Sequence, residues 1–318
     1  MKFIILIIFA LPVNSQLFEK INGNPSMIKK IYLRAVKKNN IWQPGPAFSE
    51  FETYYDREGK PVKEIEKSSG QIVLQKNFIH KDFSESQKEC EDAIKKAEKS
   101  TSFSESQETD FSKVCLKLKG KDLKIKLQYN ASPQEKSPKP FKTFLYAFKG
   151  KKAEEYVFDA DLFLEYAVSK KADAKNQITE EIKSDIDGKQ IEKTVYKYSS
   201  QPLSVSVKYF DENDLLKKEI IKEYRTDNTL RIQTEITYDN LEQIFSKTST
   251  ECDSSGFPIN EKQYDQNGNL NYEITYSYQY DSKANWTHMF KHKKRIVYGK
   301  KMEDEIPPEI VSREIKYY

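Results

Sequence analysis

Two histidines near the end of the chain, His288 and His292, are spaced so that their rings could meet. Residues four apart share a face of a helix, and the same spacing also leaves both rings on one face of a strand. A zinc site needs at least three protein ligands, and no third one is evident beside this pair. His80, the remaining histidine, is far away in the sequence. We therefore predict a solvated pair and no metal site.

The same stretch is rich in basic and aromatic side chains that could hold an anionic surface. The candidate patch consists of Trp286, His288, His292, Lys293, Lys294 and Arg295. Cations beside aromatic rings suit an acidic glycan, lipopolysaccharide or teichoic acid. Alternatively, the lysines protect an exposed terminal strand against edge-to-edge pairing. We favour this second interpretation, because the whole chain is rich in lysine.

Patterns typical of enzymes are not visible in the sequence. There is no Ser-His-Asp order, glycine-rich phosphate loop or thiolate–histidine pair. A calcium loop beginning at Asp265 fails, since its glycine, Gly268, stands fourth and Tyr276 stands where the twelfth-position glutamate belongs. A two-carboxylate glycosidase site could still be formed from the 49 acidic residues. We assign no catalytic, cofactor-binding or metal residue, and keep a carboxylate-dependent hydrolase as an alternative.

Alternation of apolar and polar residues predicts the elements that carry these side chains. In the run from Tyr272 to Tyr280, every second residue is aromatic or apolar and those between are polar. Successive side chains of a strand point to opposite faces, so the run predicts a half-buried antiparallel strand. Residues 203–209 and 232–238 follow the same pattern.

A recurring turn separates the predicted strands. An Asp at the first position can accept backbone N–H bonds, and a Gly three residues later can adopt a positive φ, which suits a type I turn closing a hairpin. Such turns begin at Asp56, Asp185, Asp211, Asp239, Asp253, Asp265 and Asp281. Including a further turn at Asp227, they recur every 12 to 16 residues from Asp211 onward. This spacing predicts one strand and one turn per unit of a meander.

The unit Tyr264-Asp265-Gln266-Asn267-Gly268-Asn269-Leu270 resembles the tyrosine–aspartate (YD, or RHS-like) repeats of bacterial exported proteins. The resemblance covers about residues 185–298, with one further copy at 55–65. It implies a mainly β fold, an extended antiparallel meander of YD-type hairpins. Asn269 stands where a basic residue is common and Ala284 where glycine is usual. The toxin-enclosing shell of large RHS-like proteins is not carried over.

A small α+β insertion interrupts this pattern near residues 82–130. Residues 82–99 read as a helix capped by Asp82 or Ser84, and residues 114–127 read as a hairpin around Gly120. Cys90 and Cys115 could form a disulfide in an exported protein, or both could be buried thiols. The third cysteine, Cys252, leaves the count odd.

The chain divides into three predicted regions. Residues 1–15 form a signal peptide, with Lys2 followed by nine apolar residues, a run too short to span a membrane. Residues 16–135 form an N-terminal β region with the helical insertion, and residues 141–318 form the antiparallel β-repeat region. No later stretch has the length of a membrane helix, so we expect an exported protein that does not span a membrane and is periplasmic, outer-surface associated or secreted.

Charge and composition limit the function further. The formal charge of +4 arises from 53 basic and 49 acidic residues, a balance that argues against a nucleic-acid partner. We predict a non-enzymatic exported β-repeat protein with a structural or binding role at the bacterial cell envelope. Its partners would be an envelope polysaccharide, a lipid or another protein. An alternative is a periplasmic lipid carrier, with a curved sheet covered by the 82–99 helix.

Overall fold

The computed structural model describes residues 21, 23–99, 109–130, 140–150, 152–302 and 306–318. Its first elements are β1 (Pro25–Lys38), β2 (Ile41–Tyr55), β3 (Pro61–Ser68), β4 (Gln71–Lys81), α1 (Phe83–Lys99), α2 (Asp110–Lys117), β5 (Asp122–Asn130), β6 (Lys142–Lys149), β7 (Lys152–Phe158), β8 (Leu164–Ala172) and β9 (Ile178–Ser184). The others are β10 (Gln190–Ser200), β11 (Leu203–Phe210), β12 (Leu216–Tyr224), β13 (Leu230–Tyr238), β14 (Ile244–Cys252), β15 (Pro258–Tyr264), β16 (Leu270–Tyr280), β17 (Trp286–Val297), β18 (Lys300–Lys301) and β19 (Glu309–Tyr317). The predicted signal peptide at 1–15 lies outside the described residues.

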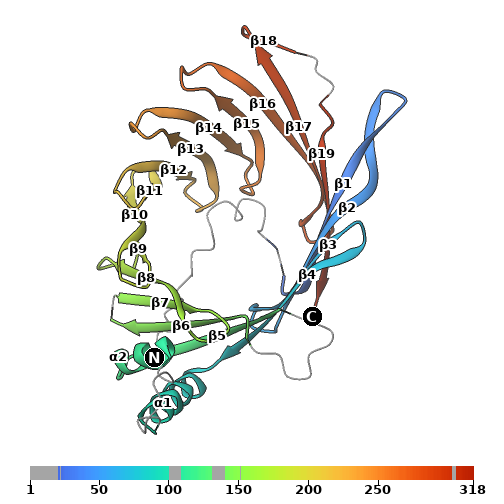
Figure 1. Cartoon of the computed structure of the whole chain (residues 1–318). Helices are drawn as coiled ribbons and strands as arrows, with labels where there is room; N and C mark the ends of the chain where they lie inside the picture. The colour runs from blue at the N-terminus through green and yellow to red at the C-terminus, as the bar shows by residue number, and fades with distance from the viewer. Residues whose placement is uncertain (1–20, 22, 100–108, 131–139, 151, 303–305) are drawn as a thin grey trace.

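All the strands belong to one sheet that closes on itself. From β1 to β17 each strand pairs antiparallel with the next, β17 pairs with β19, and β19 pairs with β1. Among the strands that the structure describes, the short β18 pairs only with β17, so 18 of these 19 strands form the ring. Figure 1 shows the ring nearly end-on, with β1 and β2 beside β19. The prediction of a mainly antiparallel meander is confirmed, and its closure into a barrel is a finding of the structure.

Closure corrects one expectation drawn from the sequence. We expected a chain that does not span a membrane, because it contains no apolar stretch of sufficient length. That expectation is contradicted by the closed ring of antiparallel strands, since barrels of this kind cross membranes with short strands. A search for long apolar segments cannot detect them.

Many of the turns that connect the strands follow one pattern. At ten turns of the described chain, the first residue donates its N–H to the carbonyl of the fifth and accepts a bond from the N–H of the fourth. These turns begin at Asp56, Asp159, Asp173, Asp185, Asp211, Arg225, Asp239, Asp253, Asp265 and Asp281. At the nine aspartates the side chain also accepts two backbone N–H bonds, which confirms the role predicted for it. Asp227 is not a first residue, because its turn begins at Arg225.

The fourth residue of each turn has a positive φ, which is the position where glycine was expected. Glycine occupies it in four of the ten turns, for example Gly268 with φ 78°. Leu162, Glu242 and Ala284 adopt the same conformation at φ 66°, 57° and 59°. L-residues are strained there, so the hydrogen bonds made by the aspartate help to hold these turns in shape.

The helical insertion lies against the outside of the ring (Figure 1). Asp82 caps α1, as one of the two predicted caps, by accepting the backbone N–H of Glu85 at 2.8 Å, and Glu85 in turn accepts the N–H of Asp82 at 3.1 Å. Cys90 and Cys115 form a disulfide between α1 and α2, with their Cα atoms 5.3 Å apart. Of the helices in the described residues, none is long and apolar enough to cross a membrane.

The prediction of a hairpin over residues 114–127 is wrong in its first arm. Residues 110–117 form α2, which begins after the cap Thr109. Phe111, Val114, Cys115 and Leu118 follow helical spacing and are buried on one side. Val114, Leu116 and Leu118 alternate with polar residues or cysteine in the sequence, but Leu116 is exposed, so this alternation does not mark a strand.

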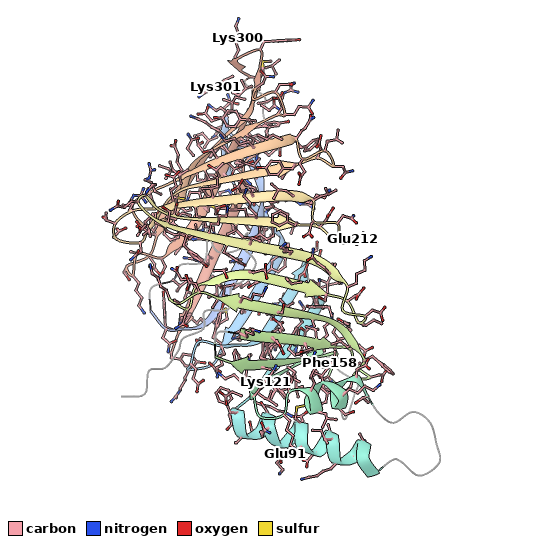
Figure 2. The ribbon with its side chains drawn as sticks, turned by 90° about the vertical axis from the view of Figure 1, so that its left-hand side faces the viewer. Glu91, Lys121, Phe158, Glu212, Lys300 and Lys301 are labelled. Carbon is pink, nitrogen blue, oxygen red and sulfur yellow. A yellow bond between two sulfur atoms is a disulfide. The ribbon has the colours of Figure 1, made fainter. Side chains whose placement is uncertain are left out.

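Two apolar cores lie on opposite faces of the sheet. The outer core joins the helices to β5–β8, and its buried members are Cys90, Phe111, Val114, Cys115, Leu118, Leu123, Ile125, Leu127, Leu145, Ala147, Tyr156 and Phe158. The inner core faces the inside of the ring, and its buried members are Phe257, Ile274, Tyr276, Trp286, Met289 and Val311. Figure 2 shows Phe158 beside the helices, at the far end of the view from Lys300 and Lys301. The predicted boundary between residues 135 and 141 stays a prediction, and β5 and β6 on its two sides pair with each other.

Candidate binding cavity on the inner wall

The strand register shows which side chains face the inside of the ring. Ile125 of β5 contacts the helices outside the ring, so its neighbours Lys124 and Lys126 face inward. Lys124 lies opposite Tyr146, and Tyr146 lies opposite Glu155. Because side chains alternate along each strand, the register places each paired residue either on the inner wall or on the outer face of the ring.

The inner wall is rich in aromatic and charged side chains. One row of directly opposed residues runs from β10 to β17 and consists of Tyr196, Val207, Ile220, Glu235, Thr248, Gln263, Tyr272 and Arg295. Lys218 and Glu235 of this wall form an ion pair at 2.7 Å, and Lys170 and Glu181 form another at 2.9 Å. Such a surface can contact polar and aromatic groups of a ligand. An apolar ligand, such as an acyl chain, would leave the charged side chains of the wall desolvated.

A cavity of about 250 Å³ opens on this wall where the ring closes. It is lined by Ile21, Ile28, Lys30, Tyr32, Phe51, Thr53, Tyr55 and Arg313. The strands β1, β2 and β19 supply all of these residues except Ile21. Two cations and three aromatic rings therefore line a site that exists only because the two ends of the sheet meet.

Lys30 and Arg313 are directly opposite each other across the β1–β19 pairing. The side chain of Arg313 is buried, and its Nε donates to the carbonyl oxygen of Trp286 at 3.0 Å. Its guanidinium carbon also lies 3.9 Å from the ring centroid of Trp286. These contacts fix the arginine beside the cavity. Because the guanidinium is already stacked on a ring, it would lose little further freedom on binding a ligand.

The strand alternation separates the six residues of the candidate anionic-surface patch. His288, His292 and Lys294 lie on the outer face, whereas Lys293 and Arg295 lie on the inner wall. Trp286 is 1% exposed and belongs to the inner core. The structure therefore does not bring the six together on one surface. On the inner wall, Nζ of Lys293 lies 3.7 Å from the ring centroid of Tyr272.

The two histidines four apart share the outer face, as strand spacing requires. The rings of His292 and Phe290 are stacked, with their centroids 6.5 Å apart. Nε2 of His288 lies 3.4 Å from the hydroxyl oxygen of Ser312. Among the described residues, no group of three or more His, Cys, Asp or Glu side chains is placed to hold a metal ion.

The outer face of β10–β15 carries charge in every part of its height. One of its rows consists of Val195, Lys208, Glu219, Ile236, Lys247 and Tyr264. Lys208 and Glu219 lie 3.9 Å apart, and Glu219 also accepts the hydroxyl of Ser206 at 2.8 Å. Each outward lysine would cost about 2–4 kcal/mol at the middle of a bilayer. The outer face of these strands therefore carries lysine and glutamate side chains next to isoleucine and tyrosine.

Sequence reasoning missed the residues of the cavity. Ile28, Lys30 and Tyr32 alternate with Lys29 and Ile31, which is a weak strand signal and shows nothing of the partner strand. Arg313 lies more than two hundred residues away along the chain. No local pattern reveals that β1 pairs with β19, because the pairing depends on the curvature of all the strands between them.

No protein-family model matches the chain, and no curated protein matches it. Among solved structures, it is similar to a porin-like protein from Bacteroides uniformis, with 9% sequence identity over 93% of this chain and 98% of that one and a TM-score of 0.42. It is also similar to a porin-like protein from Bacteroides vulgatus, with 9% identity over 61% of this chain and 93% of that one and a TM-score of 0.29. These likenesses are too remote to carry an argument about activity.

Proposed function

We propose that this chain is an exported β-barrel protein of the bacterial cell envelope with a non-enzymatic binding role. The observation that carries the proposal is that the strands of the described residues close into a ring, with a cavity on its inner wall. A closed sheet leaves no long edge for aggregation, which suits an exported protein. The ten uniform turns support, as part of the same proposal, a relationship to the YD-repeat proteins.

The contents of the cavity favour binding over hydrolysis. Its lining, within the described residues, contains Lys30, Arg313, Thr53 and the hydroxyl-bearing Tyr32 and Tyr55, and no carboxylate. A glycosidase site needs two carboxylates on either side of the bond that it breaks. The space between the helices and the sheet is filled by side chains such as Leu118 and Leu145, both fully buried, so a lipid carried beneath the helices would have to displace them.

The location is tested by expressing the full chain with a C-terminal tag in a Gram-negative host and separating the cell fractions. We expect the chain in the envelope or the medium, with its N-terminus at Gln16 after processing. The matched control carries Leu6→Arg and Ile8→Arg, which interrupt the apolar run without changing the length. Recovery of both proteins in the cytosol with Met1 retained would contradict the proposal.

A further inference from the structure

A second row of directly opposed side chains crosses the inner wall from β10 to β17. It consists of Tyr198, Val205, Lys222, Gln233, Thr250, Glu261, Ile274 and Lys293. Lys222 of β12, Gln233 of β13 and Thr250 of β14 are adjacent in it, on strands about 4.8 Å apart. The row therefore places an ammonium group, a side-chain amide and a hydroxyl next to one another.

The amide of Gln233 is buried, and its oxygen has no donor. The residue is 6% exposed, and Oε1 accepts no hydrogen bond from any group of the described residues. Thr250, which lies opposite Gln233, is also buried. Buried polar oxygens are almost always hydrogen-bonded in folded proteins. An unpaired one on the inner wall therefore indicates where a ligand can donate a hydrogen bond.

Lys222 supplies a positive charge that no carboxylate of the described residues offsets. Glu235, which also faces inward from β13, forms its ion pair with Lys218 at 2.7 Å. Glu261, two places further along the row than Gln233, accepts a hydrogen bond from the hydroxyl of Tyr276 at 2.8 Å. The ammonium group of Lys222 can therefore pair with an anion that a ligand brings.

An exposed aromatic ring lies at the start of the same row. Tyr198 is 38% exposed, and its hydroxyl donates to the carbonyl oxygen of Ile178 at 2.8 Å, which holds the ring in place. Across the strands, Val205 is the one residue between Tyr198 and Lys222. The ring can therefore pack against an apolar group of a ligand whose charge is held by the lysine.

The order of the polar groups favours a peptide over a sugar. A cation, a hydrogen-bond acceptor and a hydroxyl donor follow one another from Lys222 to Thr250. The carboxy-terminal end of a peptide presents an anion, an N–H donor and a carbonyl acceptor in the same order. A sugar hydroxyl both donates and accepts, so a sugar does not require this order.

We propose that this row binds the carboxy-terminal end of an extended peptide. The terminal carboxylate pairs with the ammonium group of Lys222, and the last N–H of the peptide donates to Oε1 of Gln233. The carbonyl oxygen before that N–H accepts from the hydroxyl of Thr250, and an aromatic side chain of the last residue packs against Tyr198. The inference deepens the proposed binding role by naming a ligand class, and it rests on that role.

Binding can be followed by the fluorescence anisotropy of alanyl-alanyl-phenylalanine with an N-terminal dansyl group, added to the purified full chain. We expect this peptide to bind in a saturable way. The same peptide with a C-terminal amide should bind about tenfold more weakly, because it has no charge for Lys222. Glucuronate tests the acidic sugars, and it should fail to displace the dansyl peptide at concentrations at which N-acetyl-phenylalanine displaces it.

Three substitutions separate the site from a general charge effect. Lys222→Gln should weaken the carboxylate peptide about tenfold and remove its advantage over the amide peptide. The matched control is Lys247→Gln on the exposed outer face of β14, which should leave binding unchanged. Gln233→Met keeps the length of the side chain but removes the unpaired oxygen, so it should weaken both peptides by a similar factor. Circular dichroism confirms that each variant is folded.

Equal affinity for the carboxylate and amide peptides would overturn the inference, as would equal losses in the Lys222 and Lys247 variants. So would displacement of the peptide by glucuronate, which would assign the row to acidic sugars, or the absence of saturable binding to the folded chain. These measurements use purified protein and do not depend on its location in the cell. A failure here is therefore distinguishable from a failure of the fractionation experiment, which tests the proposed function.

Discussion

The covered wall, β5–β8, and the bare wall, β10–β15, share the same hairpin geometry but place apolar side chains differently. On the covered wall the outer face is apolar, with Ile125, Leu145 and Phe158 fully buried beneath the helices. On the bare wall the outer face carries Lys208 and Glu219, and the buried residues, such as Ile220, face inward. Strands with an apolar outer face therefore need helices packed on that face, whereas strands with an apolar inner face do not.

This difference shows what the helical insertion contributes. Without α1 and α2, the apolar outer face of β5–β7 would be an exposed patch of the kind that promotes association. The two helices meet that face, and the backbone N–H of Ile125 donates to the hydroxyl of Ser86 at 2.9 Å within the buried contact. The insertion thus covers one apolar sector of the outer face, whereas the bare wall has no such covering helices.

The largest effect in this comparison is expected from the outer core. Phe158→Ala removes a fully buried ring that meets Phe111 edge to face at 5.2 Å, and should lower the free energy of unfolding by about 3–5 kcal/mol. The control is Phe163→Ala, since Phe163 is exposed. Urea denaturation measures both variants, and similar losses for the two would contradict the assignment of the outer core.

A smaller effect is expected from the cross-link between the helices. Cys90→Ala removes a disulfide spanning 25 residues and should lower the free energy of unfolding by about 2–4 kcal/mol. Hydrogen exchange should become faster in α1 and α2 and stay unchanged in β10–β15.

The matched control for that variant is Cys252→Ala, which removes a buried thiol but no cross-link. It should cost less than Cys90→Ala and should leave exchange in the two helices unchanged. Faster exchange of the bare wall in the Cys90→Ala variant would show that the two walls unfold as one unit.

The smallest effect is expected at a single turn of the bare wall. Hydrogen bonds from the backbone and side chain of Asn269 hold the pKa of Asp265 below its usual value. The folded state thus favours the ionised form, so the stabilisation is present above the unfolded pKa and is lost as the pH falls through the folded pKa. Asp265→Ala should lower the unfolding midpoint slightly at pH 7, and the difference from the parent should shrink below about pH 4. Thermal unfolding at both pH values measures this, and an undiminished difference in acid would disprove it.

Local features of the fold could be predicted from the sequence because they depend on neighbouring residues. The alternation from Tyr272 to Tyr280 identified β16, and the aspartate turns identified hairpins whose bonds close within five residues. Turns at Asp159 and Asp173 were not predicted, although their hydrogen bonds follow the same pattern as those of the predicted turns.

The candidate site could not be predicted, because it depends on distant pairing. The residue types from Trp286 to Arg295 indicated a single basic surface, whereas alternation directs Lys294 outward and Lys293 inward. The cavity joins Lys30 to Arg313, and only the closed ring makes them neighbours. Spacing along the chain contains no information on that contact.

The seam between β1 and β19 has a consequence for how the chain folds. Nearly every other pairing joins consecutive strands and can form as soon as its hairpin is complete, but this one joins residues 25–33 to 310–317. Contacts between such distant segments are slow to form, because the intervening chain must be ordered first. The ring therefore closes late, and until then β1 has an open edge available to other strands. The cavity is thus among the last features to form, and its presence reports that the whole ring has folded.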